Sequence, residues 1–512
     1  MLLFSLLIWN NQTTQLVDCL KLAWSKQKVY RKGQHAIEGL KLKKLILLTV
    51  GLLSSGAQAM NCANEFSWLK KTFEENDAGF SYVIDSKGEA SYQNLNSQTI
   101  KKLDGVTDPK QCHEILKDWL FFFRKGHIAL FLNTSSSSTV ATEKTKNIFD
   151  MSSFKKRITA LPADDLQGLW QFSDYTIALD KTGEEYVGYI VESDNPSWKP
   201  NDIKLKFILK DNTLSAIYYM GDRSQREISS VERYGNNAII LDDGFVAMRR
   251  LNPKEEDAQE VNRYVRLITA NSPLFERVSS DTVLLRIPSF FHGQKQAIDR
   301  LIKENFKTIA STNNLIIDIR GNGGGSDASY SEILPLLYTN PIRNVGVEML
   351  STPLNNKRMV DYAEGEEYPQ EIRNWAKASI DKLNANEGKF VQLEKERVTV
   401  EQFDAVLPQP AQVAILIDKN NGSSAEQFLL AAKQSKKVKL FGTTTTGVLD
   451  ISNIHQVNSP SGNLTLYYSL SRSFRIPDMT IDGIGLQPDY FIDSSVPKYQ
   501  WVDFTTDVLE YQ

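Results

Sequence analysis

Apolar residues recur every three or four positions from Asn61 onward, as in FSWLKKTFEEN and PKQCHEILKDWLFFFRKGH. This spacing gathers apolar side chains on one face of a helix and predicts a helical N-terminal domain over residues 60–133. The pattern changes near the end of that range, where HIALFLN alternates as a strand does. Residues 134–167 are interpreted as a linker and helix, because TSSSSTVATEK has the composition of a connector.

Short β-like runs separated by polar turns occupy residues 168–252. They include EYVGYIVES, DIKLKFILKD and LSAIYYMG. Runs of this length at regular spacing predict a small β barrel or sandwich. The charged stretch NPKEEDAQE then begins a linker over residues 253–280.

Longer and fully apolar runs follow in residues 281–512. The strand candidates are VLLRIPSFF, LIIDIR, QVAILIDK and KVKLFG, with the helical patterns AIDRLIKENF and AEQFLLAAKQ among them. Strands that lack polar alternation belong in a sheet covered on both faces, and strands that alternate with helices are typical of α/β domains. We therefore expect an α/β C-terminal core.

The N-terminal region contains a segment with the layout of a secretory signal. Lys43 and Lys44 precede an apolar core at 45–53 and the small-x-small sequence at 57–59. We predict a signal peptide at about 40–59, with residues 1–39 an over-extended start; a buried helix is the less favoured alternative. The apolar core is about half the roughly 20 residues that span a bilayer, so we expect no stable membrane anchor after cleavage. The mature protein would be periplasmic or extracellular.

Composition limits the partners and the redox chemistry. Hydrophobic residues make up 41%, charged residues 24%, and the net charge is −3, which gives no reason to expect nucleic acid as a partner. Signal cleavage would remove Cys19 and leave Cys62 and Cys112. An even pair in an oxidising compartment is a disulfide candidate. No His/Cys cluster in the sequence suggests a metal site.

Two segments carry candidate chemistry. In NGSSAEQF, Ser423 and Ser424 lie on a strand-to-helix turn, where backbone N–H groups are unpaired. A plain N-cap is the alternative, with Glu426 completing a capping box to Ser423. The second segment, NLIIDIRGNGGGS, ends a strand in a glycine cluster that can turn N–H groups towards an anion; a glycine-rich turn is the alternative.

A serine nucleophile needs a base, and histidine is the usual one. Four histidines would remain in the mature chain, and the residues alone do not choose among them: His113, His127, His292 and His455.

An ordered set of motifs lies within about 281–495: SFF, LIIDIRGNGGG, ILIDKNNGSSAEQF, FGTTTTG and GIGLQPDYFID. In this order the motifs resemble those of the tail-specific (C-terminal processing) and tricorn-type serine peptidases. The resemblance implies a ClpP/crotonase-like core and a nucleophile three residues before the helical Glu, which selects Ser423. It places the oxyanion donors on Gly323 or Gly324 and on the N–H of Ser424.

The same resemblance bears on the base. The lysine used by bacterial processing proteases aligns with Val448, so a Ser–Lys pair is excluded at this site. His127 in RKGHIAL matches the histidine of the tricorn-like branch, and Asp482 matches its acidic residue. Gly126 departs from that branch, which has a serine there that bridges acid and histidine.

Together these features imply an exported serine endopeptidase of the carboxyl-terminal-processing type, acting on peptide or protein substrates through an acyl-enzyme without metal or organic cofactor. The rival interpretation is a catalytically inactive protein on the same fold that binds peptides or hydrophobic ligands. An acyl-thioester enzyme is less favoured, because it would leave Ser423 unexplained. Many relatives carry a PDZ domain between the histidine and serine segments; WKPNDIKLKF resembles one faintly, and we favour a different small β domain.

Overall fold

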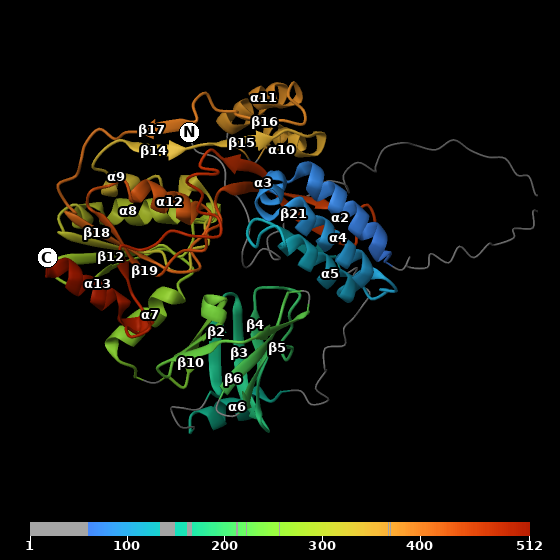
Figure 1. Ribbon diagram of the computed structural model, residues 1–512. Coiled ribbons are helices and arrows are strands. Elements are labelled where there is room, and N and C mark those ends of the chain that lie inside the picture. The colour runs from blue at the N-terminus through green and yellow to red at the C-terminus, as the bar shows by residue number, and fades with distance from the viewer. Residues whose placement is uncertain are drawn as a thin grey trace, which may run out of the picture.

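The computed structural model describes residues 60–133, 149–160, 166–210, 213–221, 223–254, 256–366, 368 and 370–511. Figure 1 shows the arrangement of the chain. The expected signal segment at about 40–59, the preceding start, and the connector at 134–148 lie outside the described residues. Within the described ranges, no helix has both the length and the apolar character needed to span a membrane.

The N-terminal part is a cluster of helices around an aromatic core. Phe73, Trp119 and Phe123 pack with ring centroids 4.8–6.0 Å apart. Cys62 and Cys112 form a disulfide between the first and last helices, which confirms the expected pairing. The helices are α2 (Cys62–Asn76), α3 (Phe80–Lys87), α4 (Glu89–Leu103) and α5 (Pro109–Phe121).

A strand after these helices connects them to the C-terminal part of the chain. β1 (Ala129–Leu132) pairs antiparallel with β21 (Leu464–Ser473), so that Ala129 faces Tyr467. The rest of this sheet is β20 (Ile451–Asn458), β15 (Val347–Leu350) and β16 (Phe390–Val391), with α10 (Pro353–Glu364) and α11 (Gln370–Asn384) packed beside it. Residues more than 300 positions apart are thereby neighbours.

The inserted β domain is a barrel. Its nine strands follow the order β7-β6-β5-β4-β3-β2-β10-β9-β8, and two residues join the edge strands β7 and β8. A flat sheet would hold those edges roughly 38 Å apart, whereas the chain from Ile228 to Val231 reaches about 11 Å. The sheet must therefore curl until the joined ends of its two edge strands lie close together. The strands are β2 (Gly168–Phe172), β3 (Tyr175–Thr182), β4 (Glu185–Ser193), β5 (Ile203–Lys210), β6 (Thr213–Tyr219), β7 (Gln225–Ile228), β8 (Val231–Tyr234), β9 (Ala238–Leu241) and β10 (Val246–Asn252); α6 (Met151–Ile158) packs against the barrel.

The C-terminal core is an α/β layer structure with a parallel sheet, which confirms the expected fold class. The strand order is β11-β12-β13-β18-β19-β22, and only the edge strand β11 is antiparallel. Helices α8 (Lys295–Ile309) and α12 (Ser424–Ala432) cover one face, and α7 (Gln259–Ile268) and α13 (Trp501–Glu510) the other. The strands are β11 (Leu274–Arg277), β12 (Thr282–Arg286), β13 (Asn314–Asp318), β18 (Gln412–Ile417), β19 (Val438–Gly442) and β22 (Tyr490–Phe491).

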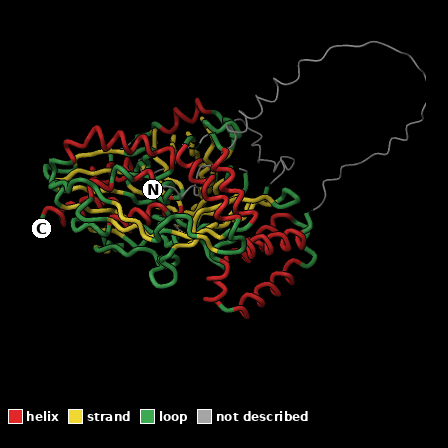
Figure 2. Tube along the Cα trace, turned by 90° about the horizontal axis from the view of Figure 1, so that it is seen from above, coloured by secondary structure: helices red, strands yellow, loops and turns green. Residues whose placement is uncertain are grey.

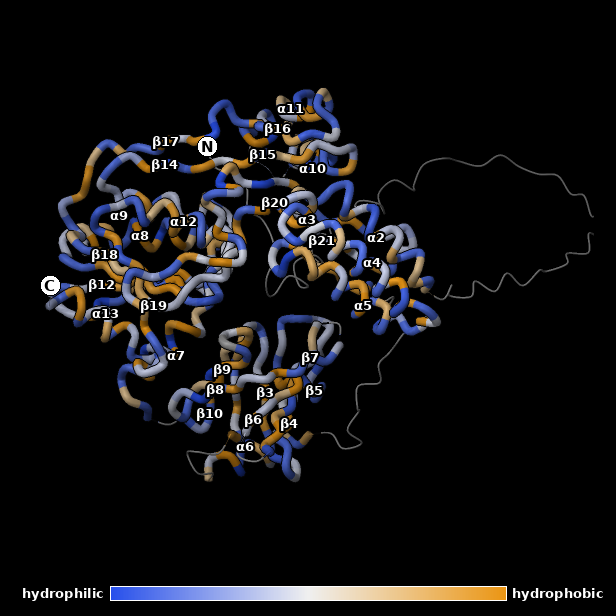
Figure 3. Tube along the Cα trace, in the orientation of Figure 1, coloured by the Kyte–Doolittle hydropathy of each residue, from blue (hydrophilic) through white to orange (hydrophobic). Residues whose placement is uncertain are grey.

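Figure 2 shows where the strands and helices lie, and Figure 3 shows the hydropathy of each residue along the chain. In Figure 2 the strands run through the middle of the described part, with helices along its borders. In Figure 3 hydrophobic colour concentrates in the strands of the core sheet around β18 and β19. A smaller element, α9 (Leu334–Leu337), and the pair β14 (Ile342–Val345) and β17 (Val398–Glu401) complete the core.

Candidate active site

Ser423 occupies the turn between β18 and α12 in a strained backbone conformation. Its φ is 55° and its ψ −126°, a region that a residue with a side chain rarely adopts. Its N–H donates to the carbonyl oxygen of Val448 at 3.0 Å, which fixes the turn. Its side chain makes no capping hydrogen bond, and the residue is partly exposed. The hydroxyl is therefore presented at the helix N-terminus instead of capping it.

Ser424 differs from its neighbour in both burial and partner. It is fully buried, and its Oγ donates to the carbonyl oxygen of Gly325 at 3.0 Å. Its backbone N–H, at the start of α12, has no acceptor among the described residues. The Ser424 hydroxyl is thus engaged, while its N–H remains free to donate.

Glu426 does not close a capping box. Its carboxylate accepts from the N–H groups of Gly447 and Val448 at 2.7 and 2.8 Å, and from the Thr445 hydroxyl. Burial raises the pKa of this carboxyl to about 7. The carboxylate ties α12 to the segment that contains Val448, so the alternative interpretation, a capping box between Glu426 and Ser423, is wrong.

The glycine cluster lies directly against this turn. A Cβ added to Gly324 would lie 2.8 Å from the Ser423 Cβ and 2.8 Å from the Ser424 nitrogen, so the close approach requires glycine. The Gly324 N–H donates to Asn322 Oδ1 at 2.9 Å and is occupied. The Gly323 N–H has no acceptor among the described residues. Of the two expected oxyanion donors in the cluster, Gly323 is the one with a free N–H.

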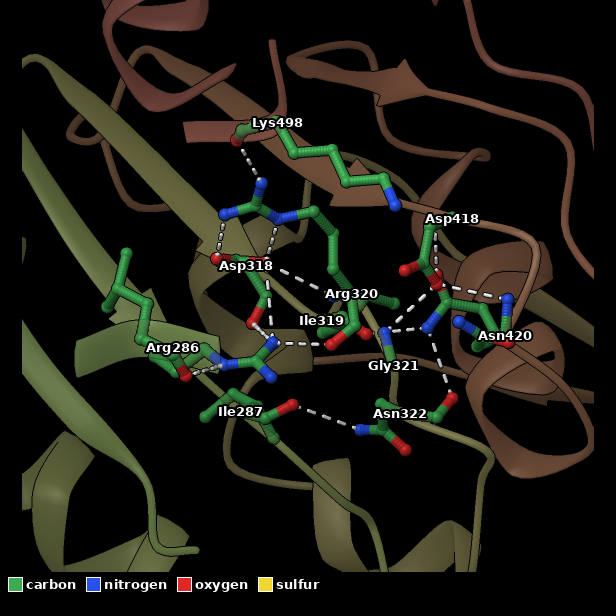
Figure 4. Close-up of polar contacts among 12 residues, drawn as sticks. Arg286, Ile287, Asp318, Ile319, Arg320, Gly321, Asn322, Asp418, Asn420 and Lys498 are labelled. Atoms are coloured by element: carbon green, nitrogen blue, oxygen red, sulfur yellow. Dashed lines mark hydrogen bonds and ion pairs between the residues drawn. The ribbon is translucent and has the colours of Figure 1, made fainter. Parts of the chain in front are cut away.

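Polar side chains hold the glycine segment and the serine turn in register (Figure 4). Asp418 Oδ1 accepts from the N–H groups of Gly321 and Asn420 at 2.9 and 3.0 Å. Asn421 donates to the carbonyl oxygens of Ile319 and Asn322 at 2.5 and 3.1 Å. The Asp418–Gly321 bond and the two Asn421 bonds join loops about a hundred residues apart. Removal of the Asn421 amide would leave buried carbonyl groups unpaired.

A buried ion cluster holds the end of β13, directly before the glycine cluster. Asp318 lies 2.7 Å from Arg320 and 3.3 Å from Arg286, and the two arginines hold the pKa of Asp318 below its usual value although burial alone would raise it. Arg320 also donates to the carbonyl oxygen of Lys498 at 3.0 Å. The cluster fixes where β13 ends and the glycine cluster begins.

His127 lies just before β1, and β1 brings it to the C-terminal core. Its φ is 54°, a second strained position. Its Nδ1 donates to the carbonyl oxygen of Ile451 at 2.7 Å. Because a carbonyl oxygen only accepts, this bond places the proton on Nδ1 and leaves Nε2 with a lone pair.

The charges around His127 oppose one another. Burial lowers the pKa of the imidazole below its ordinary value, and Arg124 lowers it further, against the Ile451 carbonyl and Asp482, which raise it. Arg124 pairs with Asp77 at 2.6 Å and donates to the Gly126 carbonyl oxygen at 3.1 Å, so it also shapes this loop. The net effect favours neutral imidazole, the form that acts as a base.

Asp482 forms hydrogen bonds with the backbone beside His127 and acts on the imidazole itself by charge. Its carboxylate accepts from the N–H groups of Leu449, Asp450 and Ile451 at 2.6, 2.6 and 3.0 Å. It therefore holds the backbone of Ile451, the residue whose carbonyl oxygen orients His127, and no hydrogen bond joins the carboxylate to the ring within the described ranges. Burial, and then the neighbouring Asp450, raise the pKa of Asp482.

Val448 lies between the histidine loop and the serine turn. A Cβ on Gly126 would be 2.1 Å from Val448 Cγ1, and one on Gly422 would be 2.7 Å from Val448 Cγ2. The loops of His127 and Ser423 thus pack on the same valine. No hydrogen bond joins His127 to Ser423 in the part of the chain that the structure describes. The valine leaves no room for a serine at position 126.

The other histidines with described side chains contact other parts of the chain. His113 Nε2 bonds to the carbonyl oxygen of Leu130 at 2.8 Å. His455 packs edge-on against Tyr468, and burial lowers the pKa of this histidine to about 4.

Comparison with known proteins identifies the C-terminal part. Residues 281–492 match the model of peptidase family S41. Solved structures similar to the chain include mature CPAF complexed with lactacystin (13% identity, 88% of this chain and 98% of the other, TM-score 0.49). A putative peptidase from Parabacteroides merdae is 13% identical over 88% of this chain and 97% of the other, with a TM-score of 0.44. The photosystem II D1 C-terminal processing protease is 14% identical over 88% of this chain and 97% of the other, with a TM-score of 0.39. No curated protein matches.

Proposed function

We propose that this chain, which belongs to peptidase family S41 through residues 281–492, is an exported serine endopeptidase that forms an acyl-enzyme on Ser423. The observation that carries the proposal is the position of Ser423. It lies strained and uncapped at the N-terminus of α12, beside the free N–H groups of Gly323 and Ser424. Such a position presents a nucleophile beside two donors for an oxyanion.

His127 is the base in this proposal. Nε2 takes the proton of the Ser423 hydroxyl as its oxygen attacks the peptide carbonyl carbon, and the Gly323 and Ser424 N–H groups stabilise the oxyanion. His127 then returns the proton to the leaving amine. Water, deprotonated by the same nitrogen, attacks the acyl carbon, and the proton passes from His127 to the departing Ser423 oxygen, which restores the hydroxyl. The steps use side chains and backbone of this chain and require no metal or organic cofactor.

In this proposal Asp482 does not touch the reacting atoms and acts through His127. Its charge raises the pKa of His127 and so favours the imidazolium that forms during the attack. Its carboxylate accepts three backbone N–H bonds, the last from Ile451, and so holds the backbone next to His127. Because His127 and Ser423 do not bond directly among the described residues, the proposal requires substrate binding to bring Nε2 within hydrogen-bonding distance of the hydroxyl.

Export to the periplasm or the outside of the cell is part of the proposal. The signal-like segment at about 40–59 supports it, and so does the disulfide between Cys62 and Cys112, since such bonds persist in oxidising compartments. The substrates would be peptides or proteins that enter the same compartment.

An inactive peptide- or ligand-binding protein is the second candidate. It is favoured because no hydrogen bond joins His127 to Ser423 in the part of the chain that the structure describes. Fluorophosphonate labelling separates the two, because only an activated serine forms the adduct. Wild-type protein and a Ser494→Ala control, changed at an exposed serine, should label on Ser423, while Ser423→Ala should neither label nor cleave peptides. Labelling that survives in Ser423→Ala, or no labelling of the wild type, contradicts the proposal.

A further inference from the structure

A wide cleft separates α5 from the β barrel and α7. It has a volume of about 2160 Å³, larger than the roughly 300–1,000 Å³ of a small-molecule site. Ten lysine and arginine residues line it, and Glu114 is the single acidic residue among the described residues of the lining. Because the chain as a whole carries a net charge of −3, this concentration of positive charge is local.

The α5 wall carries an excess of positive charge, with Lys110, Lys117 and Lys125 against Glu114. Lys110 and Lys117 are seven positions apart, two helical turns, and so share the face of α5 that borders the cleft. Lys125 continues this wall beyond the helix. Within the described ranges none of the three forms an ion pair. The opposite wall adds the exposed Arg249 and Lys254.

Several other cations of the lining already have partners. Arg223 pairs with Asp202 at 2.8 Å and Arg226 with Asp242 at 3.1 Å. Lys204 is buried at the barrel end, where its Nζ donates to the carbonyl oxygen of Tyr219 at 2.8 Å. The attraction for an anion therefore comes chiefly from the cations of the two walls that form no ion pair with a described residue.

The cleft opens beside the candidate active site. Lys125 precedes His127 by two residues. On the barrel side, a Cβ added to the lining residue Gly244 would lie 3.8 Å from Asn420 Nδ2, and Asn420 precedes Ser423 by three residues. A chain lying in the cleft would thus pass close to both loops of the site.

We propose that this cleft binds an acidic segment of the polypeptide substrate while a neighbouring peptide bond reaches Ser423. The inference rests on the proposed function, because it treats the adjoining site as one that acts on peptide bonds. Apolar side chains such as Phe121, Phe131 and Leu251 lie among the cations of the lining. An extended peptide that mixes carboxylates with apolar residues complements both.

The test compares matched peptides and matched charge changes. One fluorogenic peptide carries Asp and Glu beside the cleavage site, and its partner carries Asn and Gln. In Lys110→Glu/Lys117→Glu, kcat/KM for the acidic peptide should fall about 10-fold at low salt, with the neutral peptide unchanged. The control Lys101→Glu/Lys102→Glu changes the net charge equally on exposed positions of α4 outside the cleft. Salt should weaken the wild-type preference.

Equal losses for both peptides, equal effects of the control, or no preference in the wild type would overturn the inference. Anisotropy with the same acidic peptide and with single-stranded oligonucleotide, using Ser423→Ala, measures binding without catalysis. Tight binding of the oligonucleotide but not the peptide would also overturn it. Fluorophosphonate labelling of each variant with an intact Ser423 reports separately on the proposed function, so failure of one is distinguishable from failure of the other.

Discussion

Nδ1 of His127 donates to the backbone carbonyl oxygen of Ile451 at 2.7 Å, and the Ile451 N–H in turn donates to Asp482 at 3.0 Å. The backbone of Ile451 therefore stands between the histidine and the carboxylate. In a serine triad the carboxylate bonds the imidazole directly, fixes its tautomer and stabilises its charged form. Here the carbonyl can fix the tautomer, and the carboxylate acts on the charge through space.

This separation makes the effect of Asp482→Asn predictable. The substitution removes a charge that raises the pKa of His127, so that pKa should fall further. We expect kcat to drop about 10- to 100-fold with little change in KM, and the acid limb of kcat/KM to move to lower pH. Asp489→Asn, which removes a carboxylate that binds the Leu440 N–H, is the control. An unmoved acid limb would assign Asp482 a purely structural role.

Wild-type activity should extend below the ordinary pKa of histidine. The base must be neutral, activity is lost as pH falls through its pKa, and burial lowers that pKa from about 6.5. The midpoint of the acid limb should therefore lie below pH 6.5, both in peptide hydrolysis and in the rate of fluorophosphonate labelling. A midpoint at or above 7 would contradict the geometry around His127.

The core sheet could be predicted from the sequence, but the sheet that carries the histidine could not. The parallel strands are buried on both faces and read as continuous apolar runs, as in β13 and β18. In β21 the buried residues Ser469 and Ser471 break the apolar pattern, because hydrogen bonds with other segments satisfy their hydroxyl groups. Tertiary contacts, not local pattern, define that strand.

The candidate active site could likewise be predicted only in part from the sequence. Motif order points to Ser423 and the glycine cluster, since both lie on short local segments. The Ile451 carbonyl carries no side-chain signal, and nothing in the sequence distinguishes the occupied N–H of Gly324 from the free one of Gly323. Gly126 was visible as a departure from the tricorn-like pattern, and its contact with Val448 supplies the reason.

Gly126 and Val448 should behave as a coupled pair. Gly126→Ser places a Cβ 2.1 Å from Val448 Cγ1, and we expect a loss of about 1–3 kcal/mol in the free energy of unfolding. Val448→Ala should recover most of that loss in the double variant, measured by urea unfolding. Gly293→Ser is the control, because its nearest neighbour lies 3.9 Å away. Additive effects of the two changes would refute the steric explanation.

Adjacent glycines should respond oppositely to the same substitution. Gly324 has a φ of 102° and approaches Ser423 too closely for a Cβ, so Gly324→Ala should displace the serine turn and lower kcat by about 100-fold or more. At Gly323 a Cβ would meet nothing closer than the Asn420 carbonyl oxygen at 3.9 Å, and alanine keeps the free N–H. Gly323→Ala should therefore retain activity within about 3-fold. Thermal unfolding of both variants separates misfolding from a local loss, and a fully active Gly324→Ala would rule out the close packing of the glycine segment against Ser423.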